Sequence, residues 1–482
     1  MFPRHLSPTL TRTSPFCLFG ARGVGKTTVI RDFAGKFSNS IHLDLETASD
    51  RSIFNFEAPA METLKAISFL KGIELRGKGT LIILDELARC PGAVRWATAI
   101  MEEELNRKNK ERQGTAVHAA SAIPLVVATS SSMTEELSRL ADPADGLMQP
   151  LSLFPFSFGE FLAVMEDPAA MEAFDEVPVP YYAYEKLLNY FHLYTLIGGM
   201  PEIMSEYGLN RHLTGLRRLY EKIEERIVGD LEGITAGSKS RDLAMELLQN
   251  TYPFAATRIS LNRFGNMEKG SREIGQAFHS LERAFFLQLV HPGTSATLPL
   301  IPDRSRFPRL QMLDTGLVNY FSGIQKPLFR SHDMNAIFEG QIARQVVGQE
   351  LLSAGMAGRP QTAAEAGPEK NPSGAVYLAS PALGFWTRAK TQSTAEVDFV
   401  IPFNDLLIPV VVRSGEPGRL RALHQYVDIA PHAYAVRLYA GKLAVQQTHT
   451  LRGKKFFLLN LPYFLAGKIN DHLKGFIRLA NG

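Results

Sequence analysis

The feature that most constrains this chain is a glycine-rich loop near its amino terminus. A short apolar run, Phe16–Phe19, ends at Gly20, and the sequence then reads G-x-x-x-x-G-K-T through Thr27 before a helix-like run begins. Glycines let the backbone turn tightly, so that successive N–H groups can point at a phosphate, and the start of the next helix adds partial positive charge. This strand–loop–helix setting predicts a phosphate-binding loop.

The residue types in the loop predict how a nucleotide is held. Lys26 is expected to reach the β- and γ-phosphates, and the hydroxyl of Thr27 is expected to bind Mg²⁺. A glycine-rich turn without function is the alternative, and the Lys–Thr pair argues against it. We therefore predict ATP and Mg²⁺ as cofactors. The predicted nucleotide-binding residues are Gly20, Ala21, Arg22, Gly23, Val24, Gly25, Lys26, Thr27 and Thr28.

Two acids follow a nearly continuous apolar run. The run Thr80–Leu84 ends in Asp85 and Glu86, and such a run is typical of a parallel strand buried on both faces. Ligands bind at the carboxyl ends of parallel strands. We expect Asp85 to complete the Mg²⁺ shell with Thr27, and Glu86 to orient and polarise the attacking water. The alternative is that both acids cap the next helix, where the helix dipole favours them.

Hydroxyl side chains follow the next apolar run. Residues Ile123–Thr129 end in three serines, and Ser131 is our candidate for contact with the γ-phosphate or the water. The alternative is an N-cap for a helix expected at Met133–Leu140. The predicted catalytic residues are Glu86, Lys26 and Ser131.

Composition indicates a folded protein of several domains. A chain of 482 residues corresponds to about two to four domains. Its net charge of +3 neither demands nor excludes a nucleic-acid partner. Two cysteines make no disulfide framework or zinc site, and no apolar run approaches the roughly 18 residues of a membrane span. Because the first residues also lack a signal-peptide pattern, we expect a cytoplasmic protein without a membrane partner.

The middle of the chain predicts helices and a winged-helix unit. Residues 158–235 are expected to be mainly helical. Three short helices and a strand pair then describe a winged helix. The expected helices are at about 241–251, 259–265 and 271–287, and the expected strands are Phe286–Val290 and Arg309–Leu313.

The last of these helices takes the place of a recognition helix. Arginines can contact phosphates, and Gln276 could reach a base edge. The alternative is a module that packs against protein, so DNA and a protein partner both stay open. The basic residues around this helix are Arg258, Arg263, Lys269, Arg272 and Arg283.

Several motifs, taken in order, carry a family resemblance. They are Gly20–Thr27, Leu81–Glu86, Thr129–Ser132, Pro155–Phe161, Gly198–Glu202, Met312–Leu317 and Glu396–Phe399. In this order they resemble the bacterial and archaeal AAA-type ATPases that carry a C-terminal domain called DUF4143. The resemblance implies an AAA core, a winged-helix middle and a C-terminal domain related to the PD-(D/E)xK nuclease fold.

The chain departs from the family pattern at two places. Where the family has an arginine before the Pro/Phe connector, this chain has Leu147, which predicts slow hydrolysis or a need for a partner. In the nuclease-like domain, Glu339 and Asp398 match two metal-binding acids, and Glu396 could assist. The third acid and the lysine are replaced by Val411 and Arg413. Since valine binds no metal and arginine is a poor base, we expect a degenerate nuclease fold.

These observations predict an α/β protein with a P-loop AAA-type parallel-sheet core, a helical and winged-helix middle, and a C-terminal α/β restriction-endonuclease-like domain. We predict an Mg²⁺-dependent ATPase whose nucleotide state controls the winged-helix and nuclease-like modules. The candidate target of these modules is DNA. A slowly hydrolysing switch or scaffold that binds a protein partner is one alternative, and a metal-dependent nuclease is another; the oligomeric state is left open. The expected domains are 1–150 (ATPase), 151–238 (helical connector or lid), 239–325 (winged helix) and 326–482 (degenerate nuclease-like).

Overall fold

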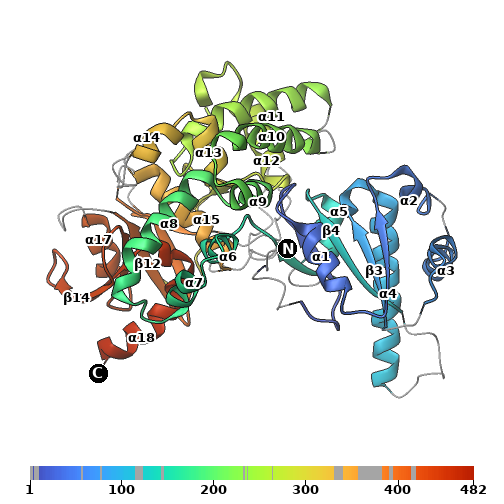
Figure 1. Ribbon diagram of the computed structural model, residues 1–482, viewed down its shortest axis with the longest axis horizontal. Helices are drawn as coiled ribbons and strands as arrows, with labels where there is room; N and C mark the ends of the chain where they lie inside the picture. The colour runs from blue at the N-terminus through green and yellow to red at the C-terminus, as the bar shows by residue number, and fades with distance from the viewer. Residues whose placement is uncertain are drawn as a thin grey trace.

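The computed structural model describes most of the chain in three parts. The N-terminal lobe (residues 10–152) lies at the right of Figure 1, the helical region (153–330) crosses the centre and top, and the C-terminal lobe (340–481) lies at the left. The described residues are 4, 10–55, 58–75, 79–113, 123–142, 146–231, 234–235, 237–262, 264–330, 340–355, 383–389, 395–413 and 420–481.

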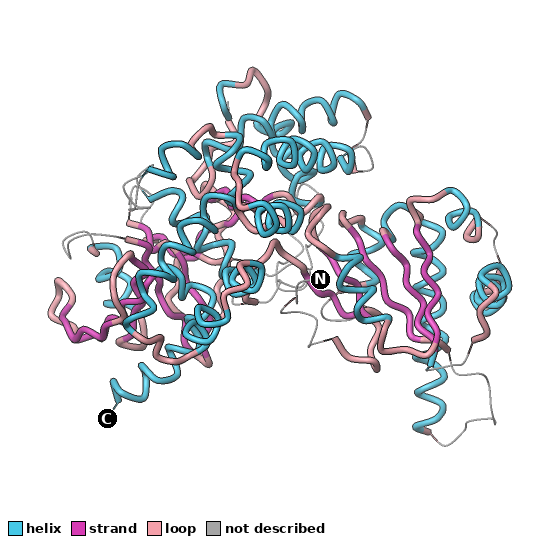
Figure 2. The backbone as a smooth tube through the Cα atoms, viewed as in Figure 1, coloured by secondary structure: helices cyan, strands magenta, loops and turns pink. Residues whose placement is uncertain are grey.

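The N-terminal lobe is a five-stranded parallel sheet in the order β2-β3-β4-β1-β5, with helices on both faces (Figure 2). Apolar runs form its central strands because both faces are covered: Leu18 belongs to one hydrophobic core, and its neighbours Cys17 and Phe19 belong to another. The predicted parallel sheet is confirmed. The strands are β1 Phe16–Phe19, β2 Asn39–Asp44, β3 Thr80–Asp85, β4 Leu125–Ser130 and β5 Gln149–Ser152. The helices are α1 Lys26–Ala34, α2 Ala48–Ser52, α3 Ala60–Lys71, α4 Pro91–Arg112 and α5 Glu135–Leu140.

The helical region follows the expected pattern except at one element. Strands β6 (Leu287–Val290) and β8 (Arg309–Met312) pair antiparallel, as predicted. The helix expected at 259–265 is wrong, because the described part contains only the short 3-10 turn η7 (Phe264–Asn266), where Gly265 is left-handed (φ 60°). A winged helix stays a prediction. The helices are α6 Phe158–Val164, α7 Pro168–Asp175, α8 Tyr184–Ile197, α9 Pro201–Asn210, α10 Arg217–Leu231, α11 Ser238–Thr251, α12 Ser271–Arg283, α13 Thr315–Phe321 and α14 Gln325–Arg330.

Motifs far apart in the sequence meet in one buried junction. Asp314 caps α13 by accepting from the Leu317 N–H (3.0 Å), and its second oxygen accepts from the Gly199 N–H (2.6 Å). A Cβ on Gly316 would lie 2.0 Å from the carbonyl oxygen of Ile197, so only glycine permits this approach. The junction therefore fixes α13 against the loop between α8 and α9.

A second buried acid joins the C-terminal lobe to this junction. Glu350 accepts hydrogen bonds from the Phe158 N–H (2.9 Å) and the Tyr194 hydroxyl (2.7 Å). Burial raises the pKa of Glu350 to about 7 and the pKa of Asp314 to about 6, although hydrogen bonds to each carboxylate act against the rise. Both carboxyl groups therefore bind a proton at a higher pH than an exposed acid does.

The C-terminal lobe contains a five-stranded mixed sheet in the order β11-β12-β13-β15-β14, beside a small sheet β10-β9-β7. Strand β7 (Pro292–Gly293) comes from the helical region, so the small sheet joins the two parts. Among the helices that the structure describes, none is long and apolar enough to span a membrane. The other strands are β9 Phe385–Thr387, β10 Glu396–Val397, β11 Phe399–Phe403, β12 Leu406–Val412, β13 Tyr434–Tyr439, β14 Ala444–His449 and β15 Lys455–Pro462, and the helices are α15 Gln341–Ser353, α17 Arg421–Ile429 and α18 Ile469–Asn481.

Candidate nucleotide-binding site

The glycine loop (Gly20–Gly25) joins β1 to α1 in a conformation that needs its glycines. Gly23 and Gly25 have φ values of +83° and +99°, in the left-handed region that favours glycine. A Cβ on Gly20 would lie 2.3 Å from the carbonyl oxygen of Leu153. The loop therefore closes tightly at the carboxyl end of β1 and leads directly into the first turn of α1.

Arg4 and the helical region contact the glycine loop from outside. Arg4 donates to the carbonyl oxygens of Val24 (2.9 Å) and Phe154 (2.6 Å). Met200 and Pro201 also approach the loop, since Cβ atoms on Gly23 and Gly25 would lie 3.5 and 3.8 Å from their side chains. A movement of the glycine loop would therefore change its contacts with the segment that leads into α9.

Lys26 is the first residue of α1, and its side chain contacts the glycine loop and faces an acid. Its Nζ donates to the carbonyl oxygens of Gly20 (2.9 Å) and Ala21 (3.3 Å), and it lies 3.2 Å from Oε1 of Glu86. The side chain is buried. This is the position from which a lysine could exchange its carbonyl partners for phosphate oxygens.

Asp85 is the last residue of β3, and three polar side chains lie against its carboxylate. The Thr27 hydroxyl lies 3.5 Å from its Oδ1, Nε2 of His42 lies 3.1 Å from its Oδ2, and the Thr129 hydroxyl donates to Oδ1. Burial acts to raise the pKa of Asp85, but hydrogen bonds with His42 and Thr129 outweigh it, so the pKa lies below its usual value. Asp85 is therefore an ionised carboxylate beside the Thr27 hydroxyl.

Glu86 is aimed toward Lys26 by a left-handed backbone. Its φ is +57°, a conformation that costs energy for a residue with a Cβ and is frequent at functional sites. Its N–H donates to the Thr129 hydroxyl (3.0 Å), and the Ser131 N–H and hydroxyl both donate to Oε2 (2.8 Å each). Burial acts to raise the pKa of Glu86, but Lys26 and Ser131 lower it below its usual value.

The helix-capping alternatives for these residues do not describe the structure. The turn η3 (Leu87–Arg89) and helix α4 have no side-chain cap, so Asp85 and Glu86 do not serve as caps there. Helix α5 is capped by Thr134, whose hydroxyl accepts from the Leu137 N–H (3.2 Å). Ser131 therefore lies against Glu86 rather than at the start of α5.

Thr27 and Asp85 suit Mg²⁺. A hydroxyl and a carboxylate are hard oxygen donors, and Mg²⁺ usually takes only one or two protein ligands together with phosphates and water. The described residues contain no group of three or more His, Cys, Asp or Glu side chains that could hold a metal ion without a nucleotide. Thr27 and Asp85 thus supply the small number of oxygen donors that Mg²⁺ takes from a protein.

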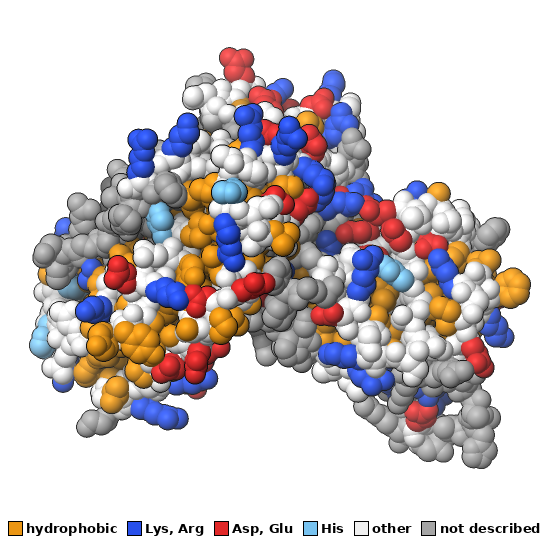
Figure 3. All heavy atoms as spheres, viewed as in Figure 1, with side chains coloured by type: hydrophobic (Ala, Val, Ile, Leu, Met, Phe, Trp, Pro, Cys, Tyr) orange, Lys and Arg blue, Asp and Glu red, His pale blue; other side chains and the backbone are white. Residues whose placement is uncertain are grey.

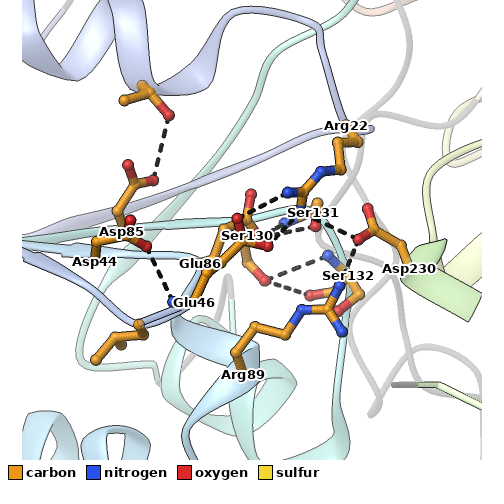
Figure 4. Close-up of polar contacts among 12 residues, drawn as sticks. Arg22, Asp44, Glu46, Asp85, Glu86, Arg89, Ser130, Ser131, Ser132 and Asp230 are labelled. Atoms are coloured by element: carbon orange, nitrogen blue, oxygen red, sulfur yellow. Dashed lines mark hydrogen bonds and ion pairs between the residues drawn. The ribbon is translucent and has the colours of Figure 1, made fainter. Parts of the chain in front are cut away.

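The site also contains residues that sequence reasoning missed. His42 lies on β2 between the buried residues Ile41 and Leu43, so strand alternation could have placed it beside Asp85. Arg89 and Asp230 form an ion pair of 2.6 Å (Figure 4). Arg89 comes three residues after Glu86, whereas no local pattern marks Asp230 in α10.

Two acids of the expected nuclease site, Asp398 and Glu396, are paired with arginines. Asp398 is 1% exposed, and its carboxylate lies 3.5 Å from Arg413 and 3.9 Å from Arg344. Arg309 donates to the Glu396 carboxylate and to the carbonyl oxygen of Asp398. The expected metal ligand Glu339 lies outside the described residues.

The expected DNA-contacting residues around α12 separate into two groups. Arg283 donates to the carbonyl oxygen of Met133 (2.8 Å) and so holds α12 to the N-terminal lobe. Arg258 lies 4.0 Å from Glu396. Lys269, Arg272 and Gln276 are exposed at the start of α12. Arg263 lies outside the described residues.

Two family models match the chain. The model described as an AAA domain matches residues 12–162, and the model of a domain of unknown function, DUF8612, matches residues 188–328. The search of curated proteins found no match. Together with the parallel sheet, the first match shows that the N-terminal lobe is an AAA-type P-loop ATPase domain. The expected DUF4143 domain is not confirmed and stays a prediction.

Three solved structures are similar to the chain at 14% identity. A Walker-type ATPase of Pyrococcus abyssi has a TM-score of 0.39, covering 67% of this chain and 96% of that one. The ORC1 protein of Aeropyrum pernix in complex with DNA has 0.29 (67% and 90%), and a RuvB mutant of Thermotoga maritima has 0.26 (59% and 85%). These TM-scores are too low to carry any conclusion about function.

Proposed function

We propose that this protein binds ATP with Mg²⁺ and hydrolyses it at the glycine loop. The observation that carries the proposal is the contact of Glu86 with Lys26 (3.2 Å) on one oxygen and with Ser131 (2.8 Å) on the other. It joins a cation that could bind phosphate to a carboxylate that could bind water. Phosphoryl transfer depends mainly on positioning and on neutralising charge, and this arrangement supplies both.

Each residue has a separate role in this proposal. Thr27 and Asp85 would hold Mg²⁺, which when bound neutralises charge on the β- and γ-phosphate oxygens. Lys26 would contact the same phosphates. Glu86 keeps a lowered pKa, so it accepts a hydrogen bond from the attacking water and orients it. Ser131 holds the Glu86 carboxylate in place.

We further propose that nucleotide state is passed to the rest of the chain. The route starts where Gly23 and Gly25 face Met200 and Pro201, and it continues through the hydrogen bond from Gly199 to Asp314 (2.6 Å). The exposed start of α12 would contact DNA, or a protein in its place. The C-terminal lobe would serve as a degenerate nuclease-like module.

Phosphate release from ATP tests the proposal directly. Wild type and Glu86→Gln would be compared with Mg²⁺, each with and without duplex DNA over a series of salt concentrations. Turnover that depends on Glu86 supports an ATPase, and stimulation that weakens with salt supports DNA as the partner. Turnover that is equal in the two proteins would remove Glu86 from the mechanism.

A slowly hydrolysing nucleotide switch is the second candidate. It is favoured by Leu147, which packs against the hydrophobic core of the N-terminal lobe where the resembling family has an arginine. This candidate predicts tight ATP retention and little phosphate release in every condition. A nuclease is not proposed, because Asp398 and Glu396, the described acids of its expected metal site, are paired with arginines.

A further inference from the structure

A carboxylate from the helical region lies among the side chains of the ATPase site. Asp230 is near the end of α10 and is 3% exposed. Its Oδ1 lies 2.6 Å from Arg89 and 3.3 Å from Arg22 (Figure 4). Arg22 belongs to the glycine loop, and Arg89 closes the turn that follows Glu86. One acid of the helical region thus bridges two arginines of the ATPase domain.

Asp230 also faces the groups expected to handle the terminal phosphate. Burial raises the pKa of its carboxyl, and the charge of Glu86 acts in the same direction. The charge of Arg22 and a hydrogen bond with Ser131 act to lower the pKa. Ser131 in turn donates to Glu86. The Asp230 carboxylate is therefore a neighbour of the residues proposed to position the attacking water.

A second acid holds the glycine-loop arginine on its other side. Arg22 makes a bidentate pair with Glu46, at 2.5 and 2.7 Å. Figure 3 shows acidic and basic side chains gathered where the N-terminal lobe meets the helical region. Of the two acids, Glu46 belongs to the same lobe as Arg22, and only Asp230 connects the arginines to a different part of the molecule.

Carboxylate and phosphate compete for the same kind of partner. Guanidinium groups bind both through charge-assisted hydrogen bonds, often in pairs. A γ-phosphate and the Asp230 carboxylate carry charge of the same sign, so each weakens the other's hold on a shared arginine. ADP has no γ-phosphate, so with ADP bound nothing competes with Asp230 for the two arginines.

We infer that Arg22 and Arg89 bind the terminal phosphate of ATP and that Asp230 competes with it, so that ATP, but not ADP, releases α10 from the ATPase domain. The inference rests on the proposed function and adds the contact that distinguishes the two nucleotides. The resembling family has an arginine where this chain has Leu147. The inference supplies two other arginines of the same chain, Arg22 and Arg89, near the terminal phosphate.

Nucleotide affinities test the competition. Dissociation constants for a non-hydrolysable ATP analogue and for ADP, both with Mg²⁺, would be measured by calorimetry. Asp230→Asn keeps the shape and removes the charge, so it should tighten binding of the analogue about tenfold and change ADP binding less than about twofold. Arg89→Ala should weaken binding of the analogue about tenfold. Glu221→Gln is the matched control, because it removes an acid of the same helix whose partners are Arg217 and Tyr320, and it should change neither constant.

Hydrogen exchange of α10 in the wild-type protein gives a second readout that needs no variant. Exchange in the final turns of α10 should be faster with the analogue than with ADP. Equal exchange, or an Asp230→Asn variant that shifts both nucleotides alike or neither, would overturn the inference and leave the ATPase proposal standing. Failure of wild type to bind either nucleotide would overturn the proposed function itself.

Discussion

Two pairs of acids beside sheet strands differ in their surroundings: Asp85 and Glu86 at the end of β3, and Glu396 and Asp398 at β10. In the N-terminal lobe, Asp85 and Glu86 are contacted by hydroxyls, one histidine and one lysine. In the C-terminal lobe, Glu396 and Asp398 are contacted by arginines. The first set of partners can be exchanged for phosphate, metal and water. The second set consists of guanidinium groups, which keep their charge at any ordinary pH and so balance the charge of both acids.

The comparison shows that the residue type of an acid does not decide its use. Asp398 sits in a sequence motif that resembles a metal site, but guanidinium groups neutralise it. Asp85 has less charge around it and keeps a hydroxyl ligand beside it. What surrounds the acid therefore decides whether it can serve catalysis or only stability.

The largest effect is expected from Lys26→Ala. Without the ammonium group the phosphates lose a direct contact, and turnover should fall about a thousandfold or more, with loss of nucleotide binding. Phosphate release and calorimetry would measure this. Lys36→Ala, an exposed lysine just after the same helix, should behave like wild type. A Lys26→Ala protein that still hydrolyses ATP would contradict the role of the N-terminal acids and Lys26 in ATP hydrolysis.

Arg309→Ala should destabilise the C-terminal lobe by about 4 kcal/mol, because it removes a buried partner of Glu396 and leaves that charge without it. Trp386 is buried in this lobe, so urea unfolding could be followed by its fluorescence in a Trp96→Phe background. Arg139→Ala, at an exposed pair with Glu135, should leave the midpoint nearly unchanged. Equal midpoints for the two variants would mean that the arginine pairing is not structural.

Glu350 tests an acid that has neither metal nor arginine. Its pKa of about 7, against 4.5 in an unfolded chain, means that the folded protein holds the extra proton between these values, so stability falls as pH rises through this window. The difference corresponds to roughly 3 kcal/mol above pH 7. Glu350→Gln should be the more stable protein at pH 8 and equal to wild type near pH 4. Urea midpoints over this pH range would measure it, and parallel curves for both proteins would contradict the buried-acid assignment.

Thr129→Val should have a smaller effect that is confined to the ATPase site. The hydroxyl donates to Asp85 and accepts from the Glu86 N–H (3.0 Å), so the isosteric valine should lower turnover about tenfold while the protein stays folded. Thr98→Val removes a hydroxyl that bonds only within α4 among the contacts of the structure and serves as the matched control. Unchanged turnover in Thr129→Val would mean that the acids are oriented without it.

No effect is expected from metal on the C-terminal acids. Wild type should leave supercoiled plasmid intact with Mg²⁺ or Mn²⁺, because arginines occupy the surroundings of Asp398. Agarose gels would show this. Cleavage that disappears in Asp398→Ala would break the comparison and restore the nuclease hypothesis.

Sequence reasoning succeeded where a local pattern specified the structure. The loop glycines, the buried strands and the positions of Asp85 and Glu86 at a strand end all follow from short patterns of residue type. It failed at 259–265, where the Ile259 N–H donates to the Pro308 carbonyl oxygen (2.9 Å) and the described residues form only the 3-10 turn η7. It also left Ser131 undecided between an N-cap and a place in the nucleotide site. The two roles differ in which residues the serine contacts, and the sequence does not specify these contacts.

The sequence by itself determined the parallel sheet and the glycine loop, because glycine conformation and strand burial depend on neighbouring residues. Only the tertiary structure decided which charges meet. Asp230 reaches Arg22 and Arg89 from α10, and Arg309 reaches Glu396 across the boundary between two parts of the chain. Such pairs depend on the packing of distant segments, and no local spacing encodes them.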